Sequence, residues 1–446
     1  MRSRQVWLVL IVLIGIALPA PGEAGGLSNT ETFGGFQFNF NNPGARALGM
    51  GGAFIGVADD ATAAVTNPAG LVILQRPELS GEVKFTRFKN NIKAFSNSPS
   101  DAPNATVHDR DFDDSVTTPS FFSFVYPTER LVVAVFTREL VHFESNFETE
   151  GVFLQGFRLF PVKSSLDVTA LNVGAGVGLN LSRDYRLLPD IGGSIEFSHG
   201  EVHSKLQRFG CPPGCGTLLG DPNFAGDHIV TTSLVDGSDI GVGFNVGALW
   251  RPVKEFSLGA VYRRGPRYNM RQTVEAGPLG LVSIQPPVLI TPPRQIYDFS
   301  LKVPDVYGIG AAYRPLDRLT IAADAVRIKY SQLRDGFQLV FNSATDLQPK
   351  DYKLDDATEF HVGAEYVMFL RSIPIAARAG FFTDPDHRIR YRGADVTSRV
   401  LFPGGRDQYH GTAGLGFVPF PGVQFDFATN ISSEIREFSI STVFRF

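Results

Sequence analysis

Residues 171–181 read LNVGAGVGLNL, and every second residue of this stretch is apolar. The odd-numbered residues are Leu, Val or Ala, whereas the even-numbered residues are Asn or Gly. A period of two predicts a β-strand with one apolar face and one small or polar face. Similar alternation recurs along the chain, for example in residues 242–250 and 423–428. The pattern therefore predicts an all-β protein.

Fourteen such segments follow one another, centred near residues 85, 122, 134, 175, 196, 246, 259, 309, 324, 362, 378, 414, 426 and 441. Short, turn-like links such as PTER at residue 127 alternate with long ones, notably 204–238 and 265–303. A transmembrane β-barrel has an even number of strands, short periplasmic turns and longer outer loops. A soluble β-sandwich also has alternating strands, but it has no reason to place every short link at one end. We therefore predict a 14-stranded antiparallel transmembrane β-barrel.

Both ends of the chain indicate export to a bacterial outer membrane. Residues 1–24 combine Arg2 and Arg4 with an apolar run and a small-residue site, which is typical of a cleaved signal peptide. The last ten residues, EFSISTVFRF, alternate and end on Phe446. A terminal aromatic residue after an alternating strand resembles the signal that the outer-membrane barrel assembly machinery recognises, so that machinery and outer-membrane lipid are the expected partners.

Charge and cysteine content exclude several classes of function. Without the signal peptide the chain has 39 basic and 44 acidic residues, a net charge of −5, and nucleic acid is not an expected partner because phosphate binding needs a basic surface. Cys211 and Cys215 lie together in FGCPPGCG, where an exported protein is expected to form a local disulfide. No metal site and no cofactor are predicted.

The stretch RALGMGGAFIGVADDATAAVTNPAG, residues 46–70, precedes the first strand and lacks its period. Its glycines do not form a nucleotide-binding loop, because Phe54 stands where the dinucleotide motif needs glycine and no Gly-Lys-Ser/Thr follows. Small residues allow a segment to approach a wall closely. Inward glycines such as Gly174, Gly178, Gly308 and Gly414 are expected to clear space for it, although they could instead ease the curvature of the barrel.

A small-residue run with ADDA, then NPAG, then a Phe-rich fourteen-strand pattern that ends in Phe resembles the FadL family of outer-membrane transporters for hydrophobic compounds. The resemblance implies that residues 25–78 form a hatch inside a barrel of residues 79–446. The matching hatch residues are Asp59, Asp60, Asn67, Pro68 and Ala69.

The resemblance also implies a function. It implies passive, cofactor-free diffusion of long-chain fatty acids or other hydrophobic molecules, gated by movement of the hatch. The apolar stretch GPLGLVSIQPPVLITPP, residues 277–293, is expected to catch ligand at the surface. Two alternatives stay open at this point: a related scaffold subunit of a protein-secretion system, and a general diffusion porin without a plug.

The strands near residues 122 and 134 are apolar on both faces. If Val133 and Val135 face lipid, then Val132, Ala134 and Phe136 face the lumen, where an apolar lining suits a ligand path better than a water channel. These three residues could also simply pack against the hatch. The family resemblance places a kink that opens the wall in the third strand, but no glycine or proline between 131 and 140 marks one.

The sequence contains no convincing catalytic constellation, so the protein is not expected to be an enzyme. An outer-membrane phospholipase is the enzymatic rival, and it needs a Ser-His-Asn/Asp geometry that spacing alone does not establish. Several charged residues are expected to face the lumen, where we expect ion pairs between wall and plug: Glu196, Glu359, His361, Glu365, Arg378 and Asp426.

Overall fold

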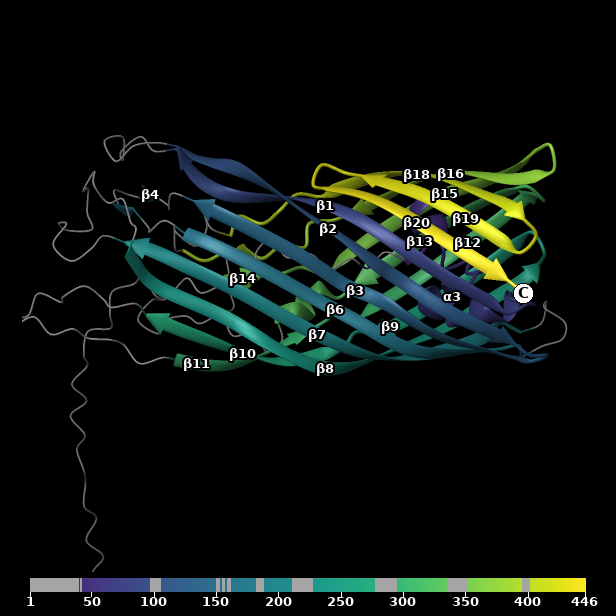
Figure 1. Cartoon of the computed structure of the whole chain (residues 1–446), viewed down its shortest axis with the longest axis horizontal. Coiled ribbons are helices and arrows are strands. Elements are labelled where there is room, and N and C mark those ends of the chain that lie inside the picture. The colour runs from purple at the N-terminus through teal and green to yellow at the C-terminus, as the bar shows by residue number, and fades with distance from the viewer. Residues whose placement is uncertain are drawn as a thin grey trace, which may run out of the picture.

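A computed structural model describes residues 40, 42–96, 106–149, 153–154, 157–158, 162–181, 188–210, 228–276, 295–334, 351–394 and 402–446. Its main feature is a closed antiparallel β-barrel (Figure 1). The first half of the wall contains β1 (Glu78–Ser96), β2 (Thr106–Pro127), β3 (Leu131–Thr149), β6 (Val162–Leu179), β7 (Asp190–Gly210), β8 (His228–Val253), β9 (Phe256–Arg264) and β10 (Arg267–Ala276). The second half contains β11 (Gln295–Lys302), β12 (Val306–Leu316), β13 (Leu319–Ile328), β15 (Ala357–Leu370), β16 (Ile373–Asp384), β18 (Gln408–Phe420), β19 (Val423–Ile431) and β20 (Ile435–Arg445).

These sixteen segments make fourteen barrel strands, because two strands are each interrupted once. The long strand β8 pairs with β9 at one end and with β10 at the other, and β12 and β11 pair with them in the same way. The interruptions fall at Pro266 and Pro304, which have no N–H for the ladder. The Asp305 carboxylate accepts a bond from the Gly265 amide at 3.2 Å and from Lys302 Nζ at 2.8 Å. This side chain thus replaces part of the missing ladder.

The ring closes where β1 pairs with β20, and all fourteen predicted strand centres fall in the fourteen barrel strands. The prediction of a 14-stranded antiparallel barrel is therefore confirmed. Outward residues carry the apolar surface: Val173 is 55% exposed, whereas its lumen-facing neighbour Asn172 is fully buried. The short turns and the C-terminus lie at the same end (Figure 1), which is the periplasmic end in barrels of this type.

The expected lengths of two long links were wrong. Residues 204–210 and 228–238 belong to β7 and β8, and residues 267–276 and 295–302 belong to β10 and β11. The strands continue beyond the apolar belt because the backbone ladder does not depend on lipid. There the outer face turns polar, while apolar residues such as Val202 and Leu206 lie on the inner face. In Figure 1 the strands β2, β3, β6, β7 and β8 accordingly extend farther to the left than β18 to β20.

In its described part, the segment before β1 contains three short helices: α2 (Ala45–Gly49), α3 (Ala63–Thr66) and the 3₁₀ helix η1 (Pro68–Ile73). Nearly all of its residues from 42 to 71 are buried. None of the helices in the described residues is long and apolar enough to cross a membrane. A 3₁₀ helix, η3 (Tyr330–Arg334), and two small two-stranded sheets are described that are not part of the barrel sheet. These sheets are β4 (Phe153–Leu154) with β5 (Phe157–Arg158), and β14 (Tyr352–Lys353) with β17 (Arg390–Tyr391).

Candidate functional site

The segment 42–74, called the hatch here, lies inside the barrel against inward glycines of the wall. A Cβ atom at Gly363 would come within 2.1 Å of the Met50 carbonyl oxygen, and one at Gly380 within 2.2 Å of the Gly51 nitrogen. A Cβ atom at Gly192 would lie 2.3 Å from the Pro68 carbonyl carbon. These distances are far below a van der Waals contact. The hatch backbone therefore occupies the space that wall side chains would otherwise fill.

The inward glycines predicted from the sequence make room for three different groups: the hatch, the Phe136 ring and an ion pair. Gly178, Gly308 and Gly414 lie against the hatch, and Gly174 lies against the Phe136 ring. A Cβ atom at Gly416 would meet the ion pair between Arg378 and Asp426. Other inward glycines contact the hatch and were missed, because a single glycine in an alternating strand gives no sign of what lies opposite. The missed residues include Gly192, Gly259 and Gly380.

Asn67 joins two parts of the hatch to the wall. Its Nδ2 group donates to the Ile55 carbonyl oxygen at 3.0 Å and to the Ala248 carbonyl oxygen of β8 at 3.1 Å. Its Oδ1 atom accepts a bond from the Ala69 amide at 3.3 Å. Pro68 is the first residue of η1, where its fixed φ suits a helix start and its missing N–H is no loss. The Asn-Pro-Ala tripeptide is thus a structural corner of the hatch.

The acidic pair of the hatch surrounds Arg46. The Arg46 guanidinium lies 2.6 Å from an Asp59 oxygen and 3.4 Å from an Asp60 oxygen. It also donates two parallel bonds of 2.9 Å to Glu365 of β15. Burial raises the pKa of Asp60, and the Arg46 charge opposes that shift. The network continues along the wall, because Glu365 also bonds Arg378 at 2.7 Å.

A second anchor is Asp324 of β13. One oxygen of its buried carboxylate accepts bonds from the Phe54 amide at 2.7 Å and from the Ile55 amide at 2.8 Å. Because both donors are backbone groups, this anchor holds the hatch loop whatever its side chains are. The hatch is thus bonded to the wall at several separate strands.

The inner face of β6 passes through three layers of the lumen. Leu166, Val168 and Ala170 come first from the outer end and belong to an apolar cluster. Asn172 follows and donates to Glu196, which also accepts a bond of 2.8 Å from Arg138. Three glycines come last, two of them beside hatch side chains. The order along the strand is therefore apolar cluster, polar network and hatch.

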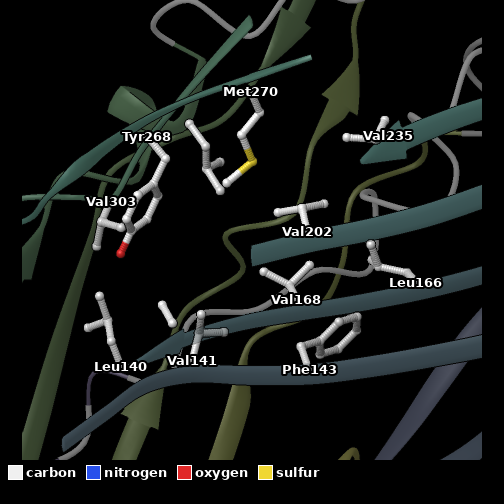
Figure 2. Packing of buried hydrophobic residues seen from close by; sticks show 12 residues of the cluster. Leu140, Val141, Phe143, Leu166, Val168, Val202, Val235, Tyr268, Met270 and Val303 are labelled. Carbon is white, nitrogen blue, oxygen red and sulfur yellow. The ribbon is translucent and has the colours of Figure 1, made fainter. Parts of the chain in front are cut away.

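The apolar cluster, called the lumen cluster here, is built from the inner faces of β3, β6, β7, β8, β10 and β11. Figure 2 shows Phe143, Val168 and Val202 on three adjacent strands, with Tyr268 and Met270 across from them. Its members are Leu140, Val141, Phe143, Leu166, Val168, Ala170, Val202, Val235, Tyr268, Met270, Leu301 and Val303.

The wall beside the lumen cluster has an open seam between β2 and β3. These strands pair only over residues 121–127 and 132–138. Beyond that point β2 continues with β1 and β3 continues with β6, so no ladder joins the two strands. Farther out, Asp114 of β2 accepts hydrogen bonds of 3.1 and 3.2 Å from Asn146 of β3. A bulge at Leu140 shifts the register of β3 at the same height. A cavity of about 70 Å³ lies at the seam, with Glu139 and His142 of β3 and Glu82 and Lys84 of β1 in its lining.

The architecture and the sequence identify a known family. Residues 27–434 match the family described as "Outer membrane protein transport protein (OMPP1/FadL/TodX)". The chain belongs to this family. It is therefore an outer-membrane channel for hydrophobic compounds and not an enzyme, and the predicted outer-membrane location is confirmed.

Solved structures of FadL-family proteins have the same fold at low sequence identity. A FadL homologue of Pseudomonas aeruginosa is 15% identical with a TM-score of 0.61, the Ralstonia pickettii toluene transporter TbuX is 14% identical with 0.57, and the P. putida toluene transporter TodX is 13% identical with 0.56. Each comparison covers 92% of this chain and 99% of the other. No curated protein sequence matches the chain.

The three wall residues predicted to line a path lie at the lower end of β3 in this FadL-family barrel. Val132, Ala134 and Phe136 are buried on the lumen side, whereas Val135 is 56% exposed on the outer side. All three pack against hatch side chains such as Ala64 and Leu71. In this structure the three residues therefore pack against the hatch, which is the alternative to a ligand path given in the sequence analysis.

Of the remaining predicted residues, the structure describes the charged lumen residues and Phe446. The charged lumen residues form ion pairs or hydrogen bonds to the wall or hatch, as His361 does with the Gly51 carbonyl oxygen at 2.7 Å. Phe446 ends the chain, and its amide donates to the Pro77 carbonyl oxygen at 3.1 Å. The signal peptide, both cysteines and the apolar stretch 277–293 lie outside the described residues, so the disulfide and the ligand-catching loop remain predictions.

Proposed function

We propose that this FadL-family channel takes up hydrophobic compounds passively, by binding them at the lumen cluster and releasing them sideways through the seam. The observation that carries the proposal is that the seam opens beside the cluster while the hatch fills the lumen below it. Leu140 and Val141 belong to the cluster and also line the seam cavity. A ligand at the cluster would therefore reach the seam without crossing the hatch.

The hatch blocks the route straight through the lumen to the periplasmic end of the barrel. It contacts the wall through backbone bonds and ion pairs, and removal of the whole hatch would break all of them at once. The seam has no ladder hydrogen bonds between β2 and β3, so widening it breaks only side-chain bonds such as those from Asn146 to Asp114 at 3.1 and 3.2 Å. Since the seam cavity of about 70 Å³ is smaller than the roughly 150 Å³ that holds one benzene molecule, side chains must move to admit a ligand.

The charges around the seam cavity favour a ligand without an anionic group. Both cations are already paired, Lys84 with Glu437 at 2.9 Å and Arg138 with Glu196 at 2.8 Å. A bare carboxylate there would meet an acidic lining. The acidic residues of the lining are Glu82, Glu139, Glu359, Asp384 and Glu437.

We therefore propose an uncharged hydrophobic compound as the preferred ligand. Two of the similar solved structures are named as toluene transporters, and an aromatic hydrocarbon fits this lining. The long-chain fatty acid that the resemblance implies remains a prediction. It would have to pass with its carboxyl group protonated or held by residues outside the described part of the chain.

Val132, Ala134 and Phe136 extend the proposed path. They lie below the lumen cluster on the same strand, against hatch helices α3 and η1. A small shift of those helices would uncover them. In this proposal the hatch moves locally to lengthen the apolar path and does not leave the barrel.

The lumen cluster is tested by Val168→Asp, which places a charge among apolar side chains. The matched control is Ser165→Asp on the outer, exposed face of the same strand β6. Cells that express each variant are assayed for uptake of labelled toluene and labelled oleate. We expect Val168→Asp to lose most uptake of toluene and the control to keep it. Equal toluene uptake by both folded variants would contradict the proposal, and faster uptake of oleate than of toluene by the unmodified protein would contradict the ligand preference.

The seam is tested by deletion of Leu140. The deletion removes the one residue that β6 does not match and keeps the inward-outward alternation on both sides of it. Strand β3 is then free to continue its pairing with β2 and to close the seam. We expect uptake to fall while the barrel keeps its heat-modifiable migration in gels. Unchanged uptake would argue for release through the hatch.

A further inference from the structure

The outer face of the wall next to the seam carries three side chains suited to bind a metal ion. His142 and Glu144 lie on β3 and Asp167 lies on β6, with Glu144 directly opposite Asp167 in the ladder. Lipid-facing Leu171 of β6, four residues from Asp167, is 51% exposed and apolar. The three side chains therefore lie above the apolar belt, where water and ions have access.

The geometry of these groups resembles a coordination shell. One ligand atom from each residue lies within 4.8 Å of the other two. His142 Nε2 is 3.6 Å from Glu144 Oε1. Two ligands of a tetrahedral ion at about 2.1 Å are roughly 3.4 Å apart. The pair thus needs only a small adjustment to hold one ion.

A fourth residue orients the imidazole. His142 Nδ1 lies 3.4 Å from a carboxylate oxygen of Glu139, on the side away from Glu144. A ligating histidine characteristically gives its other nitrogen to a carboxylate, which fixes the ring and makes it more basic. Glu139 is placed for that role, and it leaves Nε2 free to bind the ion.

Neither carboxylate has a lysine or arginine partner among the described residues, and Glu144 lies only against His142. Asp167 Oδ1 is buried and has no hydrogen-bond partner among the described residues. Two like charges directly opposite each other across a ladder destabilise it. A divalent ion would satisfy the orphan oxygen and turn the repulsion into a link between the strands.

We propose that His142, Glu144 and Asp167 bind a divalent transition-metal ion. One nitrogen and two carboxylate oxygens suit Zn²⁺, and the fourth position is left to water. The ion connects β3 to β6 immediately beyond the bulge and stiffens the edge of the seam. The inference does not depend on the ligand or the direction of transport, because its test measures metal binding alone.

The alternative is that His142 simply carries a proton and balances the two acids without a metal. Nearby pairs of this kind exist on the same outer face: His203 lies 2.8 Å from Asp236, and His199 lies 2.9 Å from Glu201. Neither pair has a third ligand among the described residues. His199 therefore provides the matched control, as an outward histidine with one acidic partner, whereas His203 lies directly opposite Asp167 in the ladder.

The experiment uses the full-length barrel in detergent, without a histidine tag and stripped of metal by a chelator. Titration calorimetry with zinc chloride and elemental analysis of the dialysed protein measure the stoichiometry. We expect one zinc per chain in the unmodified protein and in His199→Ala, and none in Asp167→Asn or His142→Ala. Glu139→Gln should keep the site but weaken it by about ten- to a hundredfold.

Two results would overturn the inference. One is no zinc or cobalt(II) bound by the unmodified barrel. The other is an equal loss in His199→Ala and His142→Ala, which would indicate diffuse surface binding. Heat-modifiable migration of every variant shows that the barrel has folded, and the cobalt(II) absorption spectrum reports the coordination geometry directly.

Discussion

Replacing Arg46 by alanine should loosen the hatch more than any other single change of charge. Its side chain is 15% exposed, and the guanidinium joins hatch residue Asp59 to wall residue Glu365. Removing one partner of a buried ion pair costs about 3–5 kcal/mol. Both acids keep a second cation, since Arg314 lies 3.4 Å from Asp59 and Arg378 lies 2.7 Å from Glu365, so the lower end of that range applies.

A loss of about 3 kcal/mol changes an equilibrium roughly 150-fold, because each 1.4 kcal/mol is a factor of ten. We take the fraction of unmodified molecules with a displaced hatch as about 0.1%, which is typical of a minor state. Arg46→Ala then raises this fraction to about a tenth. In Arg46→Lys the fraction of protein with a displaced hatch should lie between those of the unmodified protein and of Arg46→Ala. Lysine keeps the charge but does not make the two parallel bonds to Glu365.

The assay is single-channel conductance in planar bilayers, read as the fraction of time spent in a conducting state. The matched control is Arg87→Ala on the outer wall, where the ion pair with Asp113 is about half exposed and contributes little. An Arg46→Ala barrel that is folded and conducts no more often than the control would refute the role of Arg46 as a latch.

Three further results are expected. Gly363→Val should displace the hatch at Met50 and raise conductance, whereas Gly411→Ala should change nothing, because no atom lies within 4 Å of a Cβ atom there. Asp324→Ala should leave the buried amides of Phe54 and its neighbour without an acceptor, at about 1–3 kcal/mol each, and should speed their hydrogen exchange. Outward Val173→Asp should lower barrel stability in lipid without changing the conductance of the barrels that fold, because its side chain faces away from the lumen.

The strands were predictable because each residue of a barrel wall meets one of two different environments. Lipid outside and a crowded lumen inside impose a period of two, and the register of β6 preserves it from Val162 to Leu179. The ends of the long strands were not predictable from the same signal. Beyond the apolar belt the outer face turns polar and apolar side chains such as Val202 and Val235 face the lumen. The outward apolar residues that mark the wall therefore stop, although the ladder continues.

The seam left a trace in the sequence that is not a glycine or a proline. On β3 the lumen side chains are even-numbered up to Arg138 and odd-numbered from Val141 onward. That slip of one residue is the bulge at Leu140, and an apolar pattern read across it could have located the seam. The partners of the charged residues could not be predicted, since Arg46 and Glu365 lie 319 residues apart.

The contacts of the hatch are unequal around the ring, and this inequality bears on how the channel opens. Toward β13, β15 and β18 the hatch is held by directional bonds, such as those of Asp324, Glu365 and Thr412. Toward β3 it meets the wall through apolar side chains such as Val132 and Ala64. Apolar packing has no preferred direction and tolerates sliding, whereas a buried hydrogen bond is lost once its partner moves. On this side the Ala61 amide also donates to Glu78 of β1 at 2.8 Å, and that bond has to follow the movement or break. The part of the hatch that packs on β3 can then slide while the part at β13, β15 and β18 stays anchored, and a ligand could pass without unplugging the barrel.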